Sequence, residues 1–600
     1  MKTRTSDSIL SGIGILLGVG LMGTAAAQSP PMRHWVDALP VPPVATTTPN
    51  PKIPSTSDYY EINMTASQHR FNSDLGMATV WTYGQPGKTP VLLGPTIVAT
   101  QNRPVVIKWI NNLPTALSDF PFKNAIDHTI PGAMVPTGAA TPHLHGGHSA
   151  ARFDGTPDQW WTADRQRGMD YITDTFTYLN DQPASLLWYH DHTMGSTRFK
   201  PYLGLAAAYL IVDNIDTGST INGQNVPVGY GKYHLPLVLQ DKQFNADGTL
   251  FYPTQGISAV HPIWVPEFFG DTPVINGKAY PYLDAQPRRY RLRLLNGSQA
   301  RFYNLHFKLA GTDLPFWVIG SEGGLLPAPA SKTSLLIAPG ERYDVIVDFT
   351  GIPLHSTVML TNDATAPEPM GDPANDVLPE LMQININTAV PENDPDISVL
   401  PADLVLPAIP RLVATAGLPP RDVVLKENTD AFGNPIEVLL NGYHFMEPTT
   451  DFVKANTTEI WQWINLTVDL HPMHPHLVAL QVLNRQKFDV LTYRTDWAAY
   501  LAAGRTPALK PDLNNYLIGQ PIPPDTEEMG FKDTVKAYPS MDPLDSTYSY
   551  VTRTIAKFTL PATSLLDYNW KTKSYGKYVY HCHILEHEEN DMMRPFEVVK

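Results

Sequence analysis

The stretch VVIKWINN (Val105–Asn112) alternates apolar and polar residues and carries an asparagine, Asn111, near its end. The stretches YRLRLLNGS (Tyr290–Ser298) and EIWQWINLT (Glu459–Thr467) repeat this pattern at similar separations along the chain. Successive side chains of a strand point to opposite faces, so each stretch is typical of a half-buried strand. For any single match, chance likeness between short strands is the alternative explanation. Three matches predict one β domain present three times.

Length and composition agree with several small β domains. The chain has 600 residues, more than one hydrophobic core accommodates. Its 57 prolines and 40 glycines, with sparse helical periodicity, are typical of many short strands joined by turns. We therefore predict an all-β fold of three Greek-key β-sandwich domains. The expected domains are 58–215, 230–387 and 421–600, with a proline-rich lead-in at 28–57 and a linker at 388–420.

The N-terminus has the features of a secretory signal peptide. Lys2 and Arg4 precede the apolar stretch Ile9–Met22, and the small residues Ala25–Ala27 follow it. A membrane anchor is the alternative, but the short apolar stretch favours cleavage. We therefore assign residues 1–27 to a signal peptide and expect export to the periplasm or outside the cell. No other segment of the sequence is long and apolar enough to cross a bilayer, so we expect no membrane association after cleavage.

The charge pattern bears on the choice of partner. The formal net charge is −15, and no block of lysine or arginine stands out in the sequence. Proteins that bind nucleic acid usually carry a clustered basic surface. We therefore expect no nucleic-acid partner.

Histidines gather in four clusters, and the single cysteine of the chain lies in one of them. A metal ion would protect such an unpaired thiol from oxidation on an exported protein. One histidine pair alone is more often an ordinary buried or surface pair, but four clusters with the only cysteine among them predict metal sites. The clusters are His143 with His145; His190 with His192; His471, His474 and His476; and His581, Cys582, His583 and His587, followed by Met592.

The spacing within the clusters predicts two kinds of site. Residues i and i+2 of a strand face the same side, so His581 and His583 face one way and Cys582 faces the other. One strand can then serve a metal site on each of its two sides. If the third cluster is extended, His471 points to the side of Cys582, and the other histidines of that cluster point to the opposite side.

The donor atoms indicate copper at both sites. Cys582, His471 and His587, with Met592 as a weak axial ligand, are typical of a blue-copper electron-transfer site. Eight histidines remain, which suits a group of three copper ions with open positions for O2. A structural zinc site closes with four ligands and has no use for eight. The eight are His143, His145, His190, His192, His474, His476, His581 and His583.

Longer motifs resemble the multicopper oxidases over nearly the whole chain. They are HLHGG from His143, LWYHDH ending at His192, APGERYDVIVDFT from Ala338 and HCHILEHEENDMMRP from His581. Within that family the sequence resembles the group of the bacterial spore-coat laccase, bilirubin oxidase and phenoxazinone synthase. The resemblance implies cupredoxin-like domains, of which the middle one is a metal-free spacer. It also implies four copper ions: one of type 1, one of type 2 and two of type 3.

The same resemblance implies a role for each ligand. The type 1 copper would be held by Cys582, His471, His587 and Met592, and the type 2 copper by His143 and His474. The type 3 pair would be held by His145, His190, His192, His476, His581 and His583.

The activity implied is that of a laccase or bilirubin oxidase. A small phenolic, aromatic or tetrapyrrole (bilirubin-like) substrate would be oxidised one electron at a time, while four electrons reduce O2 to water. Water formation consumes protons, and Glu588 and Asp154 match positions that the spore-coat group uses near its O2 channel. We expect both to deliver protons. The alternative is that each only orients a ligand imidazole.

Three other functions stay open on the sequence alone. An oxidase of Cu(I) or Mn(II) for metal tolerance would use the same ligands, although the 17 methionines are scattered and form no methionine-rich insert. A copper carrier or electron-transfer protein without turnover would need only the blue site. A copper nitrite reductase would not need eight further histidines.

Overall fold

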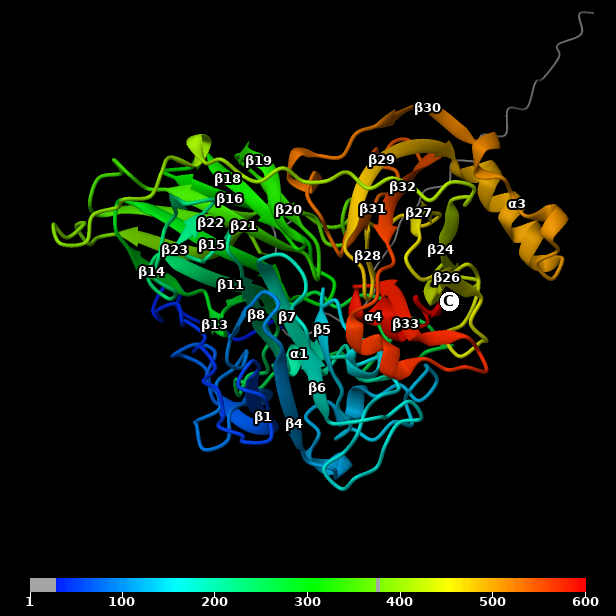
Figure 1. Cartoon of the computed structure of the whole chain (residues 1–600), viewed down its shortest axis with the longest axis horizontal. Coiled ribbons are helices and arrows are strands. Elements are labelled where there is room, and N and C mark those ends of the chain that lie inside the picture. Colours follow the sequence, from blue (N-terminus) through cyan, green and yellow to red (C-terminus); the bar gives the residue numbers. More distant parts are fainter. Residues whose placement is uncertain (1–27, 374–377) are drawn as a thin grey trace, which may run out of the picture.

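The structure is a computed structural model that describes residues 28–373 and 378–600. The predicted signal peptide, 1–27, lies outside the described residues. The described chain consists mainly of strands, which form three β-sandwiches around a common centre (Figure 1). In Figure 1 the first sandwich (blue to cyan) lies below, the middle one (green) at the upper left, and the third (yellow to red) on the right. The predicted all-β fold of three sandwiches is confirmed.

The first sandwich consists of two four-stranded sheets, ordered β2-β1-β4-β6 and β3-β8-β7-β5. Its core contains Trp81, Trp109 and Tyr189, which come from both sheets. The strands are β1 (Asp58–His69), β2 (Ala78–Gly84), β3 (Ile97–Thr100), β4 (Val105–Asn112), β5 (Pro142–His145), β6 (Thr175–Tyr178), β7 (Ser185–Asp191) and β8 (Ala206–Val212).

The middle sandwich has a sheet of order β13-β12-β11-β15-β21-β18-β19 and a sheet of order β14-β23-β22-β16-β17, with β20 paired to β16. Its core contains Leu292, Val345 and Leu360. The strands are β11 (His234–Lys242), β12 (Thr272–Ile275), β13 (Lys278–Ala279), β14 (Tyr282–Ala285), β15 (Arg289–Asn296), β16 (Tyr303–Leu309), β17 (Thr312–Leu314), β18 (Phe316–Ser321), β19 (Gly324–Lys332), β20 (Leu335–Ile337), β21 (Arg342–Asp348), β22 (Ser356–Asn362) and β23 (Glu380–Ile386). The hairpin β9 (Thr220–Ile221) and β10 (Gln224–Asn225) precedes it.

The third sandwich has sheets of order β25-β24-β27-β32-β29-β30 and β26-β34-β33-β28-β31. Its core contains Trp463 and Tyr580 together with Cys582. The strands are β24 (Arg421–Thr429), β25 (Pro435–Leu440), β26 (Asp451–Lys454), β27 (Thr458–Asn465), β28 (His471–Pro475), β29 (Leu480–Asp489), β30 (Leu517–Ile522), β31 (Val535–Ala537), β32 (Tyr548–Lys557), β33 (Ser574–Cys582) and β34 (Met593–Val599). The α-helices of the described chain are α1 (Lys200–Leu203), α3 (Val490–Ala502) and α4 (Leu585–Glu589).

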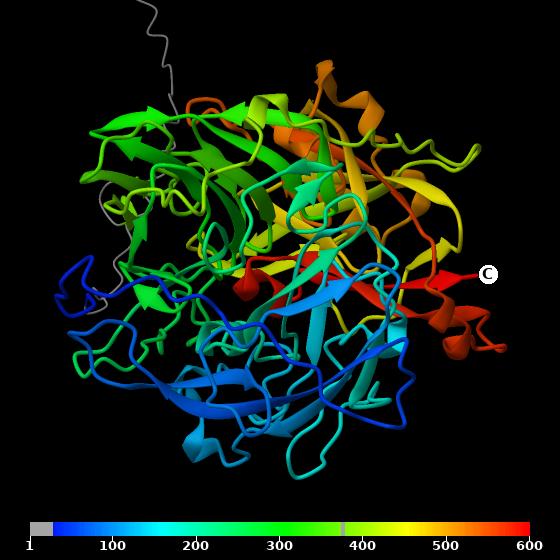
Figure 2. The ribbon, with the colours of Figure 1, turned by 60° about the vertical axis from the view of Figure 1, so that its left-hand side comes forward.

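Extended segments join the sandwiches. Residues 28–57 run across the first two sandwiches (Figure 2), where Ala38 pairs with Tyr282 and Val44 with Thr96. Residues 388–420 contain no strand and lead from the middle sandwich to the third. No helix of the described chain is long and apolar enough to span a membrane.

The asparagine near the end of each repeated stretch (Asn111, Asn296 or Asn465) closes the same turn in all three sandwiches. Its side-chain oxygen accepts a hydrogen bond from the backbone N–H two residues later, and its amide donates to two backbone carbonyls. Such an Asx turn fixes the chain at the point where it leaves the strand. Each of these strands also pairs in parallel with the equivalent strand of its own sandwich: β4 with β1, β15 with β11, and β27 with β24. The turns are at Asn111 with Leu113, Asn296 with Ser298, and Asn465 with Thr467.

Candidate metal centre

All the predicted ligands lie in two adjoining groups where the first and third sandwiches meet. In the first sandwich β5 and β7 pair so that His143 lies opposite His190. In the third sandwich β28 and β33 pair so that His474 lies opposite His581. The twelve side chains are at most 1% exposed. A metal bound there would therefore be shielded from bulk solvent by both sandwiches.

The eight histidines of the larger group interleave between the two sandwiches. His143 stacks on His476 at a ring-centroid distance of 3.9 Å, and His145 stacks on His474 at 3.7 Å. Three sets of imidazoles bring their nitrogens within 4.8 Å of one another. Each set joins residues of both sandwiches, so the site does not exist in either sandwich alone. The sets are His145, His190 and His583; His192, His476 and His581; and His143, His474 and His476.

The hydrogen bonds of three of these imidazoles leave one ring nitrogen of each without a partner. The Nδ1–H groups of His143, His190 and His474 donate to the backbone carbonyls of Asp154 (2.6 Å), Asp191 (3.0 Å) and Asp533 (2.7 Å). Their Nε2 atoms are buried without a hydrogen-bond partner, as are both ring nitrogens of His583. A buried, unpaired polar atom costs about 1–3 kcal/mol. Several such nitrogens converging on one place fit a group of metal ions.

Burial also keeps these imidazoles in the form that binds metal. Removal from water lowers the pKa of His190 to about 3 and that of His192 to about 4. The pKa values of His143 and His474 are also well below the ordinary value, again mainly because of burial. A neutral imidazole has a free lone pair at neutral pH, as a metal ligand requires.

In His145 the ring nitrogen without a partner is Nδ1, whereas in His143, His190 and His474 it is Nε2. The Nε2 of His145 lies 3.1 Å from both the Asp533 carboxylate and the Thr534 hydroxyl. The sequence did not reveal the role of Asp533, because this residue is 388 positions from His145 and belongs to no motif. A buried carboxylate beside a histidine cluster can be recognised only after folding.

Cys582 lies on the opposite side of β33, in the smaller group. Its Sγ is 3.6 Å from His471 Nδ1 and 3.9 Å from His587 Nδ1. Met592 is fully buried, and its backbone carbonyl accepts a hydrogen bond from the Cys582 N–H (3.0 Å). Burial raises the pKa of the Cys582 thiol well above its ordinary value. A thiolate there needs a cation beside it, and one sulfur with two imidazoles is a donor set that fits copper.

His471 is oriented by the third of the asparagine turns. Its Nε2 lies 2.7 Å from the Thr467 hydroxyl, which in turn donates to the Asn465 side chain (2.9 Å). The Nε2–H can therefore donate to the hydroxyl oxygen while Nδ1 faces Cys582. The turn that fixes the end of β27 thus also fixes this ring.

The two predicted proton carriers lie against the larger group. The Glu588 oxygens are 3.4 Å from His192 Nδ1 and 3.1 Å from His581 Nδ1. Asp154 Oδ2 accepts a hydrogen bond from His476 Nδ1 (2.6 Å). Both carboxylates are buried. Glu588 therefore borders the ligands of the multi-histidine group, although its neighbour in sequence, His587, belongs to the cysteine group.

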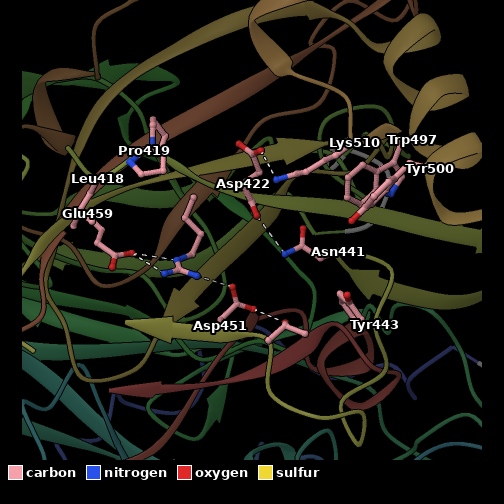
Figure 3. Close-up of a pocket in the computed structure, with 13 residues that line it drawn as sticks. Leu418, Pro419, Asp422, Asn441, Tyr443, Asp451, Glu459, Trp497, Tyr500 and Lys510 are labelled. Carbon is pink, nitrogen blue, oxygen red and sulfur yellow. Dashed lines mark hydrogen bonds and ion pairs between the residues drawn. The ribbon is translucent and has the colours of Figure 1, made fainter. Parts of the chain in front are cut away.

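A separate pocket of about 340 Å³ opens on the third sandwich between α3 and the start of β24 (Figure 3). Trp497 and Tyr500 of α3 form one wall. Arg421 lies in the pocket and is paired with Glu459 and Asp451. The pocket is lined by none of the predicted ligands.

Comparison with known proteins agrees with this geometry. A family model described as multicopper oxidase matches residues 418–600. The chain is 34% identical to the laccase of Bacillus subtilis (strain 168) over 576 residues, which cover 94% of this chain and 99% of the relative. It is 36% identical to Multicopper oxidase LPR1 homolog 3 of Oryza sativa subsp. japonica over 554 residues, which cover 88% of this chain and 97% of the relative.

The solved structure of a laccase from Pediococcus acidilactici Pa5930 has the same fold. It matches with a TM-score of 0.66 at 24% identity, over 96% of this chain and 95% of that one. The expected cupredoxin-like sandwiches are thereby confirmed. The chain belongs to the multicopper oxidase family: it is a laccase-like, copper-dependent oxidoreductase that uses O2.

Proposed function

We propose that the chain oxidises small phenolic, aromatic or bilirubin-like tetrapyrrole substrates at a type 1 site and reduces O2 to water at a trinuclear site. The observation that carries this proposal is the pair of donor sets on the two sides of β33. His581 and His583 belong to the larger group, while Cys582 between them belongs to the smaller one. A few covalent bonds of one strand therefore connect the two sites. Copper, when bound, would supply one-electron redox chemistry and activation of O2.

The proposed ligands account for four copper ions. Type 1 would be held by Cys582, His471 and His587 with Met592 as axial ligand, and type 2 by His143 and His474. The type 3 pair would be held by two triads, His145, His190 and His583, and His192, His476 and His581. The partly shared position of His476, which also lies near His143 and His474, is consistent with three ions in one cluster. Glu588 and Asp154 would supply protons from beside these imidazoles.

The proposal extends to the organisation of the chain. Residues 58–215, 230–387 and 421–600 would form the three domains, with the middle one free of metal. Residues 1–27 would direct export to the periplasm or outside the cell. Oxygen uptake by the purified chain with a phenol, bilirubin, Cu(I) and Mn(II) tests the substrate class. Uptake with none of them at full copper loading would instead favour the electron-transfer protein without turnover.

Oxidation of a metal ion is the second candidate, and three half-buried carboxyl groups that interact electrostatically with one another favour it: Glu267, Glu427 and Asp469. Burial, together with Asp469 and Glu427, raises the pKa of Glu267 well above its ordinary value. Burial and Asp469 raise the pKa of Glu427 to about 8. Glu267 and Asp469 also act on the thiol of Cys582. Crowded carboxyl groups are stabilised by a cation, and as hard oxygen ligands they suit Mn(II) better than Cu(I).

Glu267→Gln separates the two candidates. If the carboxyl group binds a metal substrate, the KM for Mn(II) should rise while the kinetics with a phenol stay unchanged, because one charged ligand is lost. Steady-state oxygen uptake with both substrates measures this. Glu380→Gln, an exposed carboxyl on β23, is the control. An equal loss with both substrates, or no change with Mn(II), would rule out metal binding by Glu267.

Met592→Leu should raise the reduction potential of the type 1 site and leave turnover largely intact. A thioether donor stabilises Cu(II) weakly, so its removal tunes the site without dismantling it. A redox titration followed at the blue absorption band measures the shift. Met593→Leu is the matched control, because Met593 is equally buried but packs in a cluster with Phe445 and Val579. An unchanged potential at full copper loading would mean that another group is axial.

A further inference from the structure

Asp533, which orients His145, is itself held by an arginine of the middle sandwich. Arg342, the first residue of β21, forms a forked pair with Asp533: Nη1 to Oδ1 at 2.7 Å and Nη2 to Oδ2 at 2.6 Å. Both side chains are at most 5% exposed. The planar guanidinium fixes the plane and rotation of a carboxylate, which a single charge does not. Oδ1 of Asp533 is also the atom that contacts His145 Nε2.

The remaining donors of Arg342 tie the three sandwiches together at this point. Its Nε donates to the carbonyl of Leu186 on β7 (3.0 Å), and Nη1 also donates to that of Gly340 (3.1 Å). One side chain of the middle sandwich therefore holds the first sandwich through Leu186 and the third through Asp533. His145 lies at this junction, paired with β7 through Trp188.

Two glycines leave the space that this arrangement needs. A Cβ at Gly146 would overlap Asp533 Oδ2 and Arg342 Nη2. A Cβ at Gly340 would lie 2.9 Å from Cγ of His583 and 3.2 Å from Cε1 of His145. Both have positive φ, +83° and +82°, which disfavours any other residue. Gly146 belongs to the HLHGG motif and Gly340 to the APGER motif, so the two motifs meet at one contact.

We propose that Arg342 is a positioning residue for the trinuclear site. By fixing Asp533, it determines that His145 turns Nδ1 rather than Nε2 to the centre. The middle sandwich, which supplies no ligand, would thus set the geometry of a ligand of the first sandwich. This inference rests on the proposed function. It predicts that loss of Arg342 damages the multi-histidine site and spares the cysteine site.

The test uses the copper-loaded full chain with Arg342→Gln, Arg342→Lys and Asp533→Asn. In all three we expect an unchanged blue band, fewer copper ions per chain, and a new EPR signal from uncoupled Cu(II). Reoxidation by O2 should slow by about 10- to 100-fold, the usual effect of losing a group that orients a metal ligand. Lysine keeps the charge but cannot form the fork, so it should not restore the site.

Arg291→Gln is the matched control. Arg291 is fully buried on β15 in the same sheet and is held by Asp216 and Asp344 in the same way, but contacts no predicted ligand. It should lower thermal stability and leave copper content and EPR unchanged. The same pattern in Arg342→Gln would overturn the proposal, as would full copper binding with an unchanged EPR spectrum in Arg342→Lys. If Arg342→Gln does not fold, the other two variants decide. A wild-type chain without the blue band would refute the proposed function instead.

Discussion

Cys582→Ser is expected to abolish the blue absorption band and substrate turnover while copper at the multi-histidine site stays bound. The band arises from a thiolate bound to copper, and Cys582 is the only thiol in the chain. A serine hydroxyl is a hard, weakly acidic donor and does not replace it. Turnover should fall below detection, because substrate electrons enter at this site. Absorption spectra, copper analysis and EPR of one preparation measure all three properties.

Because of its location, replacement of Cys582 should affect the cysteine site and leave the multi-histidine site unchanged. The side chain is fully buried and points to the side of β33 opposite His581 and His583. Serine is slightly smaller, so the strand and its pairing with β28 should be preserved. A type 2 EPR signal of unchanged shape would show that the larger site is intact. A variant that stays blue would refute the assignment of the cysteine site.

Glu588→Gln should slow reoxidation by O2 and leave reduction by substrate nearly normal. Glutamine keeps the shape of the side chain but cannot carry a proton. General acid–base groups contribute about 10²- to 10⁴-fold, so a loss of roughly 100-fold or more in reoxidation is expected. The pH optimum should move to lower pH, where free protons compensate. Stopped-flow measurement of the two half-reactions at full copper loading separates the two effects.

The alternative for Glu588 follows from its contacts with His192 and His581. If it only orients these rings, Glu588→Gln should alter the type 3 copper content or EPR spectrum, and the pH optimum should not move. Glu589→Gln is the matched control: Glu589 lies on the same helix, is buried and pairs with Arg198. Its loss should lower stability without slowing reoxidation. Normal reoxidation in Glu588→Gln would exclude the relay, and Asp154→Asn would then be the next variant.

Strand periodicity made much of the site predictable from sequence. A period of two predicts that Cys582 faces away from His581 and His583, and that His471 lies on the side of the cysteine. The structure brings these residues together in that arrangement. The threefold repetition of a strand with an asparagine near its end likewise predicted three similar domains. In the structure each of these asparagines closes a turn through local hydrogen bonds.

Long-range contacts were not predictable in this way. Asp533 and Arg342 are 191 residues apart in sequence and belong to different sandwiches, yet they form an ion pair beside His145. No local sequence pattern predicts such a contact. Glu588 shows a second limit of prediction from sequence. It follows His587 in sequence, but both lie in helix α4, where successive side chains point about 100° apart. Neighbours in a helix therefore need not serve the same site.

In the third asparagine turn, the backbone of Thr467 closes the turn while its side chain serves a different purpose. In the first and middle sandwiches the residue two positions after the asparagine is Leu113, which packs in the core, or Ser298, whose hydroxyl hydrogen-bonds with that of Tyr303. In the third it is Thr467, whose hydroxyl holds His471. The turn needs only the backbone N–H at that position, so its side chain is free to vary. A threonine at this position can therefore orient a histidine while the backbone of the turn stays the same.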